Sequence, residues 1–161
     1  MTKHYVTWVI CAVLSAFPVA GECGGLGLTC SVSAPDINFG TYNTMNSISL
    51  PAANITVTCS AIFGSVAPTV QLSSGSGSYL ARAMNGPAGN TLNYNLYTNS
   101  SYTTVFGDGT SGTGYYSGPR QSIFFSSVTY SVPVYAQLPG GQNVAPGSYI
   151  TSQPITVTVR Y

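Results

Sequence analysis

Short stretches in which apolar and polar residues alternate recur along most of this chain. The clearest is residues 55–59, where Ile, Val and Cys alternate with Thr, and residues 69–73 and 92–97 follow the same pattern. Such alternation is typical of a half-buried β-strand. Further stretches of this kind are residues 30–34, 37–39, 128–134 and 155–161. Turn residues separate them and helical periodicity is lacking beyond the N-terminal segment, so the pattern predicts an antiparallel all-β sandwich.

The last of these stretches runs to the C-terminal residue. Its apolar residues Ile155, Val157, Val159 and Tyr161 fall on one face, because side chains alternate along a strand. A strand in a sandwich needs neighbours on both edges, and no residues follow to supply one. We therefore expect one edge of the terminal strand to lack a partner within the domain.

The N-terminal segment has the features of a secretory signal. Lys3 and His4 form a weakly basic start, and residues 5–17 are apolar. This apolar stretch is shorter than the roughly 20 residues that a membrane-spanning helix needs. We expect a signal peptide at residues 1–21, a single mature domain at residues 22–161 and no membrane span after signal removal. The alternative is a retained N-terminal anchor.

Charged residues are scarce, and this limits the kinds of binding and catalysis that the chain can support. They make up 4% of the chain, against about 25% in an average globular protein, and the net charge of +1 gives no basis for binding nucleic acid. Once the signal is removed, neither Lys nor His remains. Hydrolytic catalysis usually needs such a base, while Asp36 and Asp108 stand in turn-forming contexts. We expect no enzymatic activity, no cofactor and no metal site.

One glycine-rich run matches the spacing of a dinucleotide-binding loop. Residues 107–112 read GDGTSG, which fits G-x-G-x-x-G. That loop works only when a helix follows it and an acidic residue lies about 20 residues further on. Here Gly118-Pro119 follows, and no Asp or Glu occurs after Asp108. We therefore interpret the run as a structural loop.

Three cysteines remain after signal removal, at positions 23, 30 and 59. Export makes a disulfide plausible. Cys30 and Cys59 each lie in an alternating stretch, so they can face each other inside a sandwich, whereas Cys23 lies among glycines. We predict a Cys30–Cys59 disulfide with Cys23 outside the pair.

Several short motifs follow one another from Cys30 to the C-terminus. They are CSVS at 30–33 and FGTY at 39–42, LSSG at 72–75, R-x-M with Arg82 and Met84, LNYNLY at 92–97 with Tyr94, Asn95 and Tyr97, FGDG at 106–109 with Gly107, Asp108 and Gly109, VYAQLP at 134–139, PGSY at 146–149 and TVTV at 156–159. In this order they resemble the spore coat protein U domain, a family that includes the pilins of archaic chaperone–usher pili. Phe106 replaces the Trp of the family pattern, and Ala136-Gln137 replaces its Gly-Arg.

The resemblance implies an incomplete immunoglobulin-like antiparallel β-sandwich of pilin type. Such a subunit lacks its last strand, and a strand from a periplasmic chaperone, and later from a neighbouring pilin subunit, fills the groove by β-strand addition. The partners implied are the chaperone, an outer-membrane usher and other pilin subunits. The implied location is a cell-surface pilus or an extracellular coat, reached through the periplasm. The groove residues would be Val32, Ile155, Val157, Val159 and Tyr161.

One departure from the family concerns the donor segment. Only residues 21–29 precede Cys30, with Leu26 and Leu28 as alternating apolar residues among four glycines. A donor strand needs about ten extended residues. The chain is therefore expected to accept a strand without donating one, as at the tip of a fibre, or to assemble as a coat.

Two other functions fit parts of the sequence. A small outer-membrane β-barrel would agree with the alternating C-terminal strand and the many tyrosines. A secreted sugar-binding β-sandwich would use Tyr102, Tyr115 and Tyr116 as stacking platforms. Ordinary loop packing is the favoured interpretation of these three tyrosines.

Overall fold

The computed structural model of the protein describes residues 25–161, and the predicted signal peptide lies outside them. The elements are β1 (Gly25–Leu26), β2 (Thr29–Ser33), β3 (Ile48–Val66), β4 (Thr69–Leu72), β5 (Arg82–Asn85), η1 (Pro87–Gly89), β6 (Thr91–Tyr97), β7 (Tyr116–Ser117), β8 (Gln121–Leu138) and β9 (Val157–Arg160). No helix in this part of the chain is long and apolar enough to cross a membrane.

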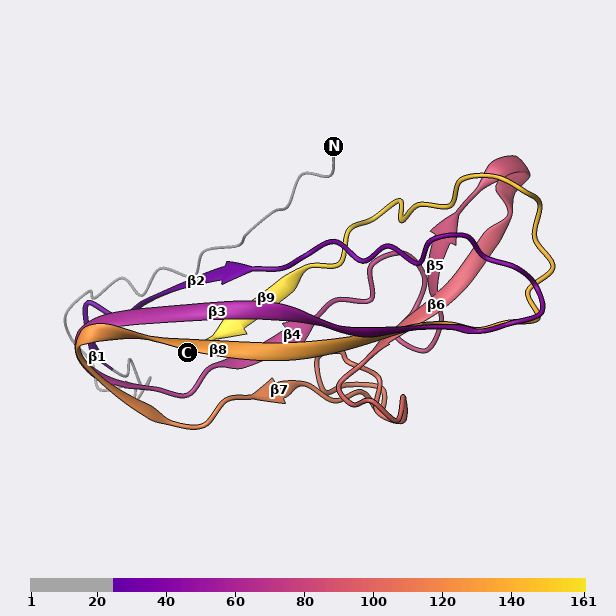
Figure 1. Ribbon diagram of the computed structural model, residues 1–161. Helices are drawn as coiled ribbons and strands as arrows, with labels where there is room; N and C mark the ends of the chain where they lie inside the picture. Colours follow the sequence, from indigo (N-terminus) through magenta and orange to yellow (C-terminus); the bar gives the residue numbers. More distant parts are fainter. Residues whose placement is uncertain (1–24) are drawn as a thin grey trace.

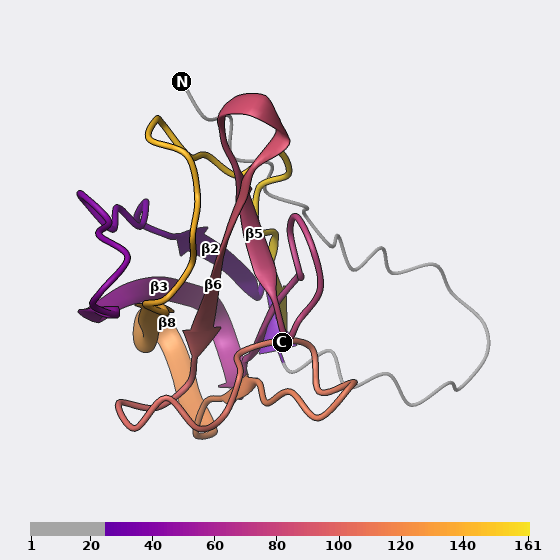
Figure 2. The same ribbon diagram turned by 90° about the vertical axis from the view of Figure 1, so that its right-hand side faces the viewer.

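Two long strands, β3 and β8, run side by side along the length of the molecule (Figure 1). They pair in antiparallel register from Ile48↔Leu138 to Val66↔Gln121, with one irregularity between Leu50 and Ala53. Pro51 lies in that interruption, where it costs no ladder hydrogen bond. β1 lies at one end of the β3–β8 pair, and the β5–β6 hairpin projects from the other end (Figures 1 and 2).

The strands form two sheets. The larger has the order β1-β3-β8-β6-β5, with β2 also paired to β3, and the smaller has the order β7-β4-β9. All strand pairs are antiparallel. The predicted antiparallel all-β sandwich is therefore confirmed. The predicted strand at residues 37–39 is wrong: Asn38 Oδ1 accepts the Gly40 N–H at 2.8 Å to make a turn, while Ile37 and Phe39 still pack on the core.

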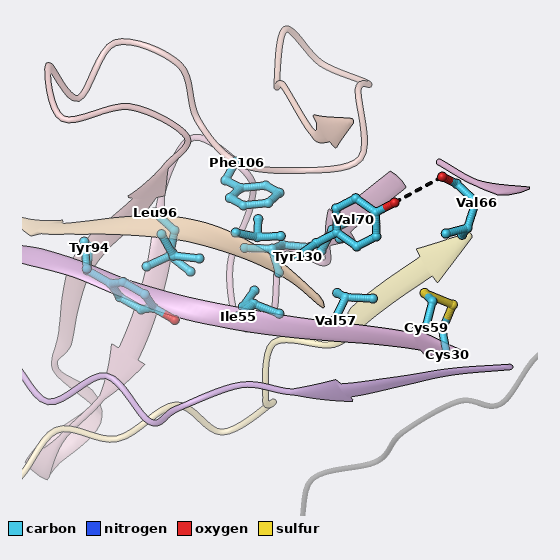
Figure 3. Close-up of a cluster of buried hydrophobic side chains, with 14 of the residues drawn as sticks. Cys30, Ile55, Val57, Cys59, Val66, Val70, Tyr94, Leu96, Phe106 and Tyr130 are labelled. Carbon is cyan, nitrogen blue, oxygen red and sulfur yellow. Dashed lines mark hydrogen bonds between the residues drawn. A yellow bond between two sulfur atoms is a disulfide. The ribbon is translucent and has the colours of Figure 1, made fainter. Parts of the chain in front are cut away.

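The core lies between the two sheets and follows the alternation read from the sequence. Ile55 and Val57 of β3 are paired with Val132 and Tyr130 of β8, and these four residues and Cys59 are 0–4% exposed. Figure 3 shows Ile55, Val57, Cys59 and Tyr130 in this core. The Tyr130 hydroxyl donates to the Val66 carbonyl at 3.1 Å, so this buried polar group is satisfied.

The outer face of the larger sheet carries hydroxyl groups in place of charges. Thr29 Oγ1 lies 3.2 Å from Ser60 Oγ across β2 and β3, and Thr58 Oγ1 lies 3.2 Å from Thr129 Oγ1 across β3 and β8. Because Ser and Thr hydroxyls hydrogen-bond both to one another and to water, this face is solvated without ionised side chains. It accounts for much of the low charge of the chain.

Candidate strand-acceptor groove

Several strands at the borders of the sandwich pair along one edge only, and β2 and β9 are two of them. Within residues 25–161, β9 pairs only with β4, and β2 pairs only with β3. An unpaired edge presents a row of free N–H and C=O groups to any further strand. The free edges of β2 and β9 are therefore candidate places for a further strand. β1 and β7 also pair on one side only, but each has just two residues.

The five predicted groove residues lie at these two strands. Val32, Ile155, Val157, Val159 and Tyr161 are half-buried and pack against the core. The β4 partners of β9 are far less accessible: Leu72, opposite Val157, is 3% exposed and Val70, opposite Val159, is 0% exposed. The side chains of β9 are thus covered from one side only, as expected for a strand beside an open groove.

The terminal strand is shorter than predicted. The sequence pattern indicates a strand over residues 155–161, but β9 covers only Val157–Arg160. Ile155 and Tyr161 flank it. Just before β9 the ladder keeps one backbone bond, from the Ser73 N–H to the Thr156 carbonyl at 3.0 Å. The return bond goes to a side chain, because the Thr156 N–H donates to Ser73 Oγ at 2.9 Å.

The predicted disulfide is present. Cys30 of β2 and Cys59 of β3 are bonded and stand directly opposite each other in the ladder. Both residues are buried, at 6% and 0% exposure, and Figure 3 shows the bond at the β2 side of the core. The bond fixes β2, a strand with a free edge, to the long strand β3. Cys23 lies outside the described residues.

A buried arginine joins the two sheets behind the groove. Arg82 of β5 is 0% exposed, and its guanidinium donates to Asn95 Oδ1 at 2.6 Å, to the Ser73 carbonyl at 2.9 Å and to the Phe106 carbonyl at 2.7 Å. The ring of Tyr79 lies 5.6 Å from the guanidinium carbon, in cation–π range. Arg82 Nε has no hydrogen-bond partner in the described part of the chain. All three acceptors are neutral groups. We call Arg82 together with these three acceptors the arginine hub.

Burial is the main cause of the pKa shifts of Arg82 and of the tyrosines near it. It lowers the pKa of Arg82, and the nearby tyrosines Tyr94, Tyr79 and Tyr97 partly oppose that shift. Burial also raises the pKa of Tyr94 and of Tyr97, while Arg82 acts in the opposite direction on both. An arginine remains charged at neutral pH even so. The hub is accordingly a fixed cation that holds carbonyl groups in place.

The other residues of the family motifs pack around this hub. Tyr94 is buried, and its ring meets that of Phe39 edge-on at 5.6 Å. Asn95 Nδ2 donates to the Tyr79 carbonyl at 2.9 Å. Met84 is half-buried against the core, and Tyr97 packs edge-on against Tyr102 at 5.5 Å. The sequence motif thus marks residues that meet in space, although it does not reveal which atoms they contact.

The glycine-rich run is a closed loop whose polar groups bond to one another. Asp108 Oδ1 accepts the Thr110 N–H at 2.9 Å and the Thr110 hydroxyl at 2.6 Å. The Gly107 N–H donates to the Gly114 carbonyl at 2.7 Å, and the Gly109 N–H donates to Thr113 Oγ1 at 3.1 Å. Gly109 has φ +90°, which favours glycine. Since these amides already have acceptors, the loop offers them to no phosphate.

The three tyrosines considered for sugar stacking do not form a platform. Tyr102 sits edge-on between Tyr97 and Tyr135, with ring centroids 5.5 and 6.4 Å away. Tyr116 is half-buried on the core, and only Tyr115 of the three is exposed, at 49%. Loop and core packing explains Tyr102 and Tyr116.

A cleft of about 300 Å³ opens at the irregular part of β3. It is lined by Asp36, Ile37, Asn38, Leu50, Pro51, Ala53, Val134 and Ala136. Asp36 is the single ionisable side chain in this lining. Within residues 25–161, no three His, Cys, Asp or Glu side chains are grouped so that they could hold a metal ion.

Comparison with known families decides what kind of sandwich this is. The sequence matches the model of the Spore Coat Protein U domain over residues 26–158. The chain belongs to this family. The resemblance to this family, read from the sequence motifs, implied a terminal strand with one unpaired edge. The comparison with curated proteins found no match.

A solved structure has a similar fold. The domain is similar to a chain of the CsuC–CsuE chaperone–tip adhesion subunit pre-assembly complex, from the archaic chaperone–usher Csu pili of Acinetobacter baumannii, with a TM-score of 0.52 and 20% sequence identity. The similarity covers 83% of this chain and 40% of that chain, so this domain spans two fifths of its structural neighbour. At that identity the likeness concerns the fold, and it confirms the pilin-type sandwich.

Proposed function

We propose that this domain is a structural or adhesive subunit of a surface fibre or coat that accepts a donor β-strand. The observation that carries the proposal is β9, a strand with one unpaired edge and with side chains covered from one side only. The donor lies along this edge and covers Val157 and Val159. Backbone hydrogen bonds supply affinity, and alternate side chains supply specificity.

The partners in this proposal are a periplasmic chaperone, an outer-membrane usher and other pilin subunits. The family membership supports them, as does the structural neighbour, which comes from a chaperone–subunit complex. The protein is then exported, held by its chaperone in the periplasm and placed on the cell surface. A structural role also agrees with a chain that has neither Lys nor His beyond the expected signal.

Within a fibre, the proposed position is terminal. Residues Gly25–Leu26 and Thr29–Ser33 are already used by the domain itself, because they pair with β3 as β1 and β2. A donor segment has to be free of its own domain so that it can reach another. The segment that follows the expected signal therefore serves its own sheet, which favours a subunit that accepts a strand and does not pass one on.

The acceptor role is tested with a synthetic peptide of about ten alternating Val and Thr residues, flanked by Lys for solubility. A ligand that binds only the folded state raises the melting temperature in proportion to the logarithm of its concentration. We expect this rise for the mature domain. Val157→Asp should abolish it by placing a charge in the groove, and Val157→Ala should reduce it. A melting temperature indifferent to the peptide would overturn the proposal.

The matched control is Thr158→Asp. Thr158 is the neighbour of Val157 in β9 and points to the opposite face of the strand, since side chains alternate. Its substitution adds the same charge to the same strand, but outside the groove. The Thr158→Asp variant should retain the rise in melting temperature, which separates an effect on the groove from general damage to β9.

A further inference from the structure

The acceptor strand is held in place at its entry by the loop that follows β4. Ser73 makes two hydrogen bonds with a single residue before β9: its N–H donates to the Thr156 carbonyl at 3.0 Å, and its Oγ accepts the Thr156 N–H at 2.9 Å. Three residues later, Ser76 Oγ accepts the Gln153 N–H at 2.8 Å and lies 2.8 Å from Ser152 Oγ. Two serines thus bind three residues of the segment that leads into β9, namely Ser152, Gln153 and Thr156.

The same two serines are fixed from their other side. The Ser73 carbonyl accepts the buried guanidinium of Arg82 at 2.9 Å, and the Ser76 carbonyl accepts the Ala83 N–H at 2.9 Å. Ser76 is itself buried, at 8% exposure. The loop is therefore anchored to β5, an element of the larger sheet, while its hydroxyl groups reach the terminal segment of the chain.

Gly75 allows this close approach. A Cβ at Gly75 would lie 3.0 Å from Ile155 Cγ1 and 3.3 Å from the Gln153 carbonyl oxygen, and its φ of +62° favours glycine. The segment before β9 therefore rests directly on the backbone of the loop. Any larger residue would push the terminal segment away from the two serines.

We propose that Ser73 and Ser76 form a latch, anchored by Arg82, that pre-orders β9 for an incoming strand. β9 pairs with β4 through four residues, Leu72↔Val157 to Thr69↔Arg160, so its own ladder is short. Ordering a strand at the moment of binding costs conformational entropy, and a pre-ordered edge avoids that cost. In the bound domain the donor is released when β9 frays away from it, so a latch that opposes fraying also slows release. The latch is a positioning device: neither serine contacts the donor, and both act through the segment 152–156. This inference rests on the proposed acceptor function.

The test follows the release of the labelled Val/Thr peptide, chased by excess unlabelled peptide, from mature domain already saturated with it. Ser73→Ala removes the acceptor of the Thr156 N–H but keeps the backbone bond to Arg82. The loss of one hydrogen bond should make release roughly two- to tenfold faster. Ser76→Ala should act in the same direction, and Ser73→Thr, which keeps a hydroxyl, should restore the slow rate.

Ser74→Ala is the matched control. Ser74 lies between the two latch residues, and within residues 25–161 its hydroxyl reaches only the carbonyl of the adjacent Gly75, at 3.5 Å. This variant should release the peptide at the wild-type rate. A second readout is amide hydrogen exchange of residues 152–160, which should speed up in Ser73→Ala and Ser76→Ala and stay unchanged in Ser74→Ala.

The outcomes separate the latch from the acceptor function. Unchanged release from folded Ser73→Ala and Ser76→Ala, together with loss of binding in Val157→Asp, would overturn the latch and leave the acceptor role standing. A lower unfolding midpoint with unchanged release would show that the serines only stabilise the fold, and would also overturn the latch. If the wild-type domain fails to bind the peptide at all, both proposals fail.

Discussion

At the scale of single residues, Arg82 shows how a buried cation is accommodated without a carboxylate. Its acceptors are the Asn95 side chain and the carbonyls of Ser73 and Phe106, which belong to separate parts of the chain. Buried groups of this kind cost free energy when their partner is removed. Arg82 therefore matters for the fold through the groups that it satisfies.

Arg82→Met should reduce the free energy of unfolding by about 2–4 kcal/mol, because the buried Asn95 Oδ1 and Phe106 carbonyl and the part-buried Ser73 carbonyl lose their donor. Arg82→Lys should recover only part of this, since an ammonium group cannot reproduce the planar fork. Arg120→Met is the control: that side chain is exposed and donates to Ser65 Oγ at 3.0 Å, and its replacement should cost less than about 1 kcal/mol. Urea unfolding measures all three. Equal costs at positions 82 and 120 would contradict the role of the hub.

At the scale of elements, β2 depends on the disulfide as well as on its ladder to β3. Closing a loop between Cys30 and Cys59, 29 positions apart, should stabilise the fold by about 3–4 kcal/mol on the chain-entropy estimate. Cys30→Ala/Cys59→Ala should lower the urea midpoint accordingly and speed amide exchange in Thr29–Ser33, whereas Cys23→Ala should change neither. Mass spectrometry of unreduced chymotryptic peptides identifies the bond, and a dominant link to Cys23 would contradict this pairing.

The elements also show what could be read from the sequence. Alternation revealed the central parts of β3, β6 and β8, because these strands are buried on one face. It underestimated β3, which continues through Pro51 and Asn54, and it missed the short strands β1, β5 and β7. Pairing with a long neighbour, and not local pattern, defines such strands. Likewise, the motifs pointed to Arg82 and Asn95, but the carbonyls that Arg82 binds leave no trace in a sequence.

At the scale of the whole molecule, the scarcity of ionisable groups should give stability an unusual dependence on pH. The entire chain has three acidic residues, and its one His lies in the expected signal. No side chain of the mature domain thus has an ordinary pKa between about 5 and 8. The unfolding free energy should therefore be flat across that range and change only at its acidic and alkaline limits.

The two limits have different origins. On the acid side, the Thr110 side chain and backbone donate to Asp108 and lower its pKa, so its contribution is complete above about pH 4 and is lost as pH falls further. On the alkaline side, burial raises the pKa of Tyr94, so its contribution is complete below about pH 10 and is lost above that.

Asp108→Asn should make the acid limb of the stability curve shallower and leave the alkaline limb unchanged, and Tyr94→Phe should do the reverse. Urea midpoints from about pH 2 to about pH 11 measure both limbs. A slope near neutral pH that neither variant changes would contradict this account, because it would require a titrating group other than Asp108 and Tyr94.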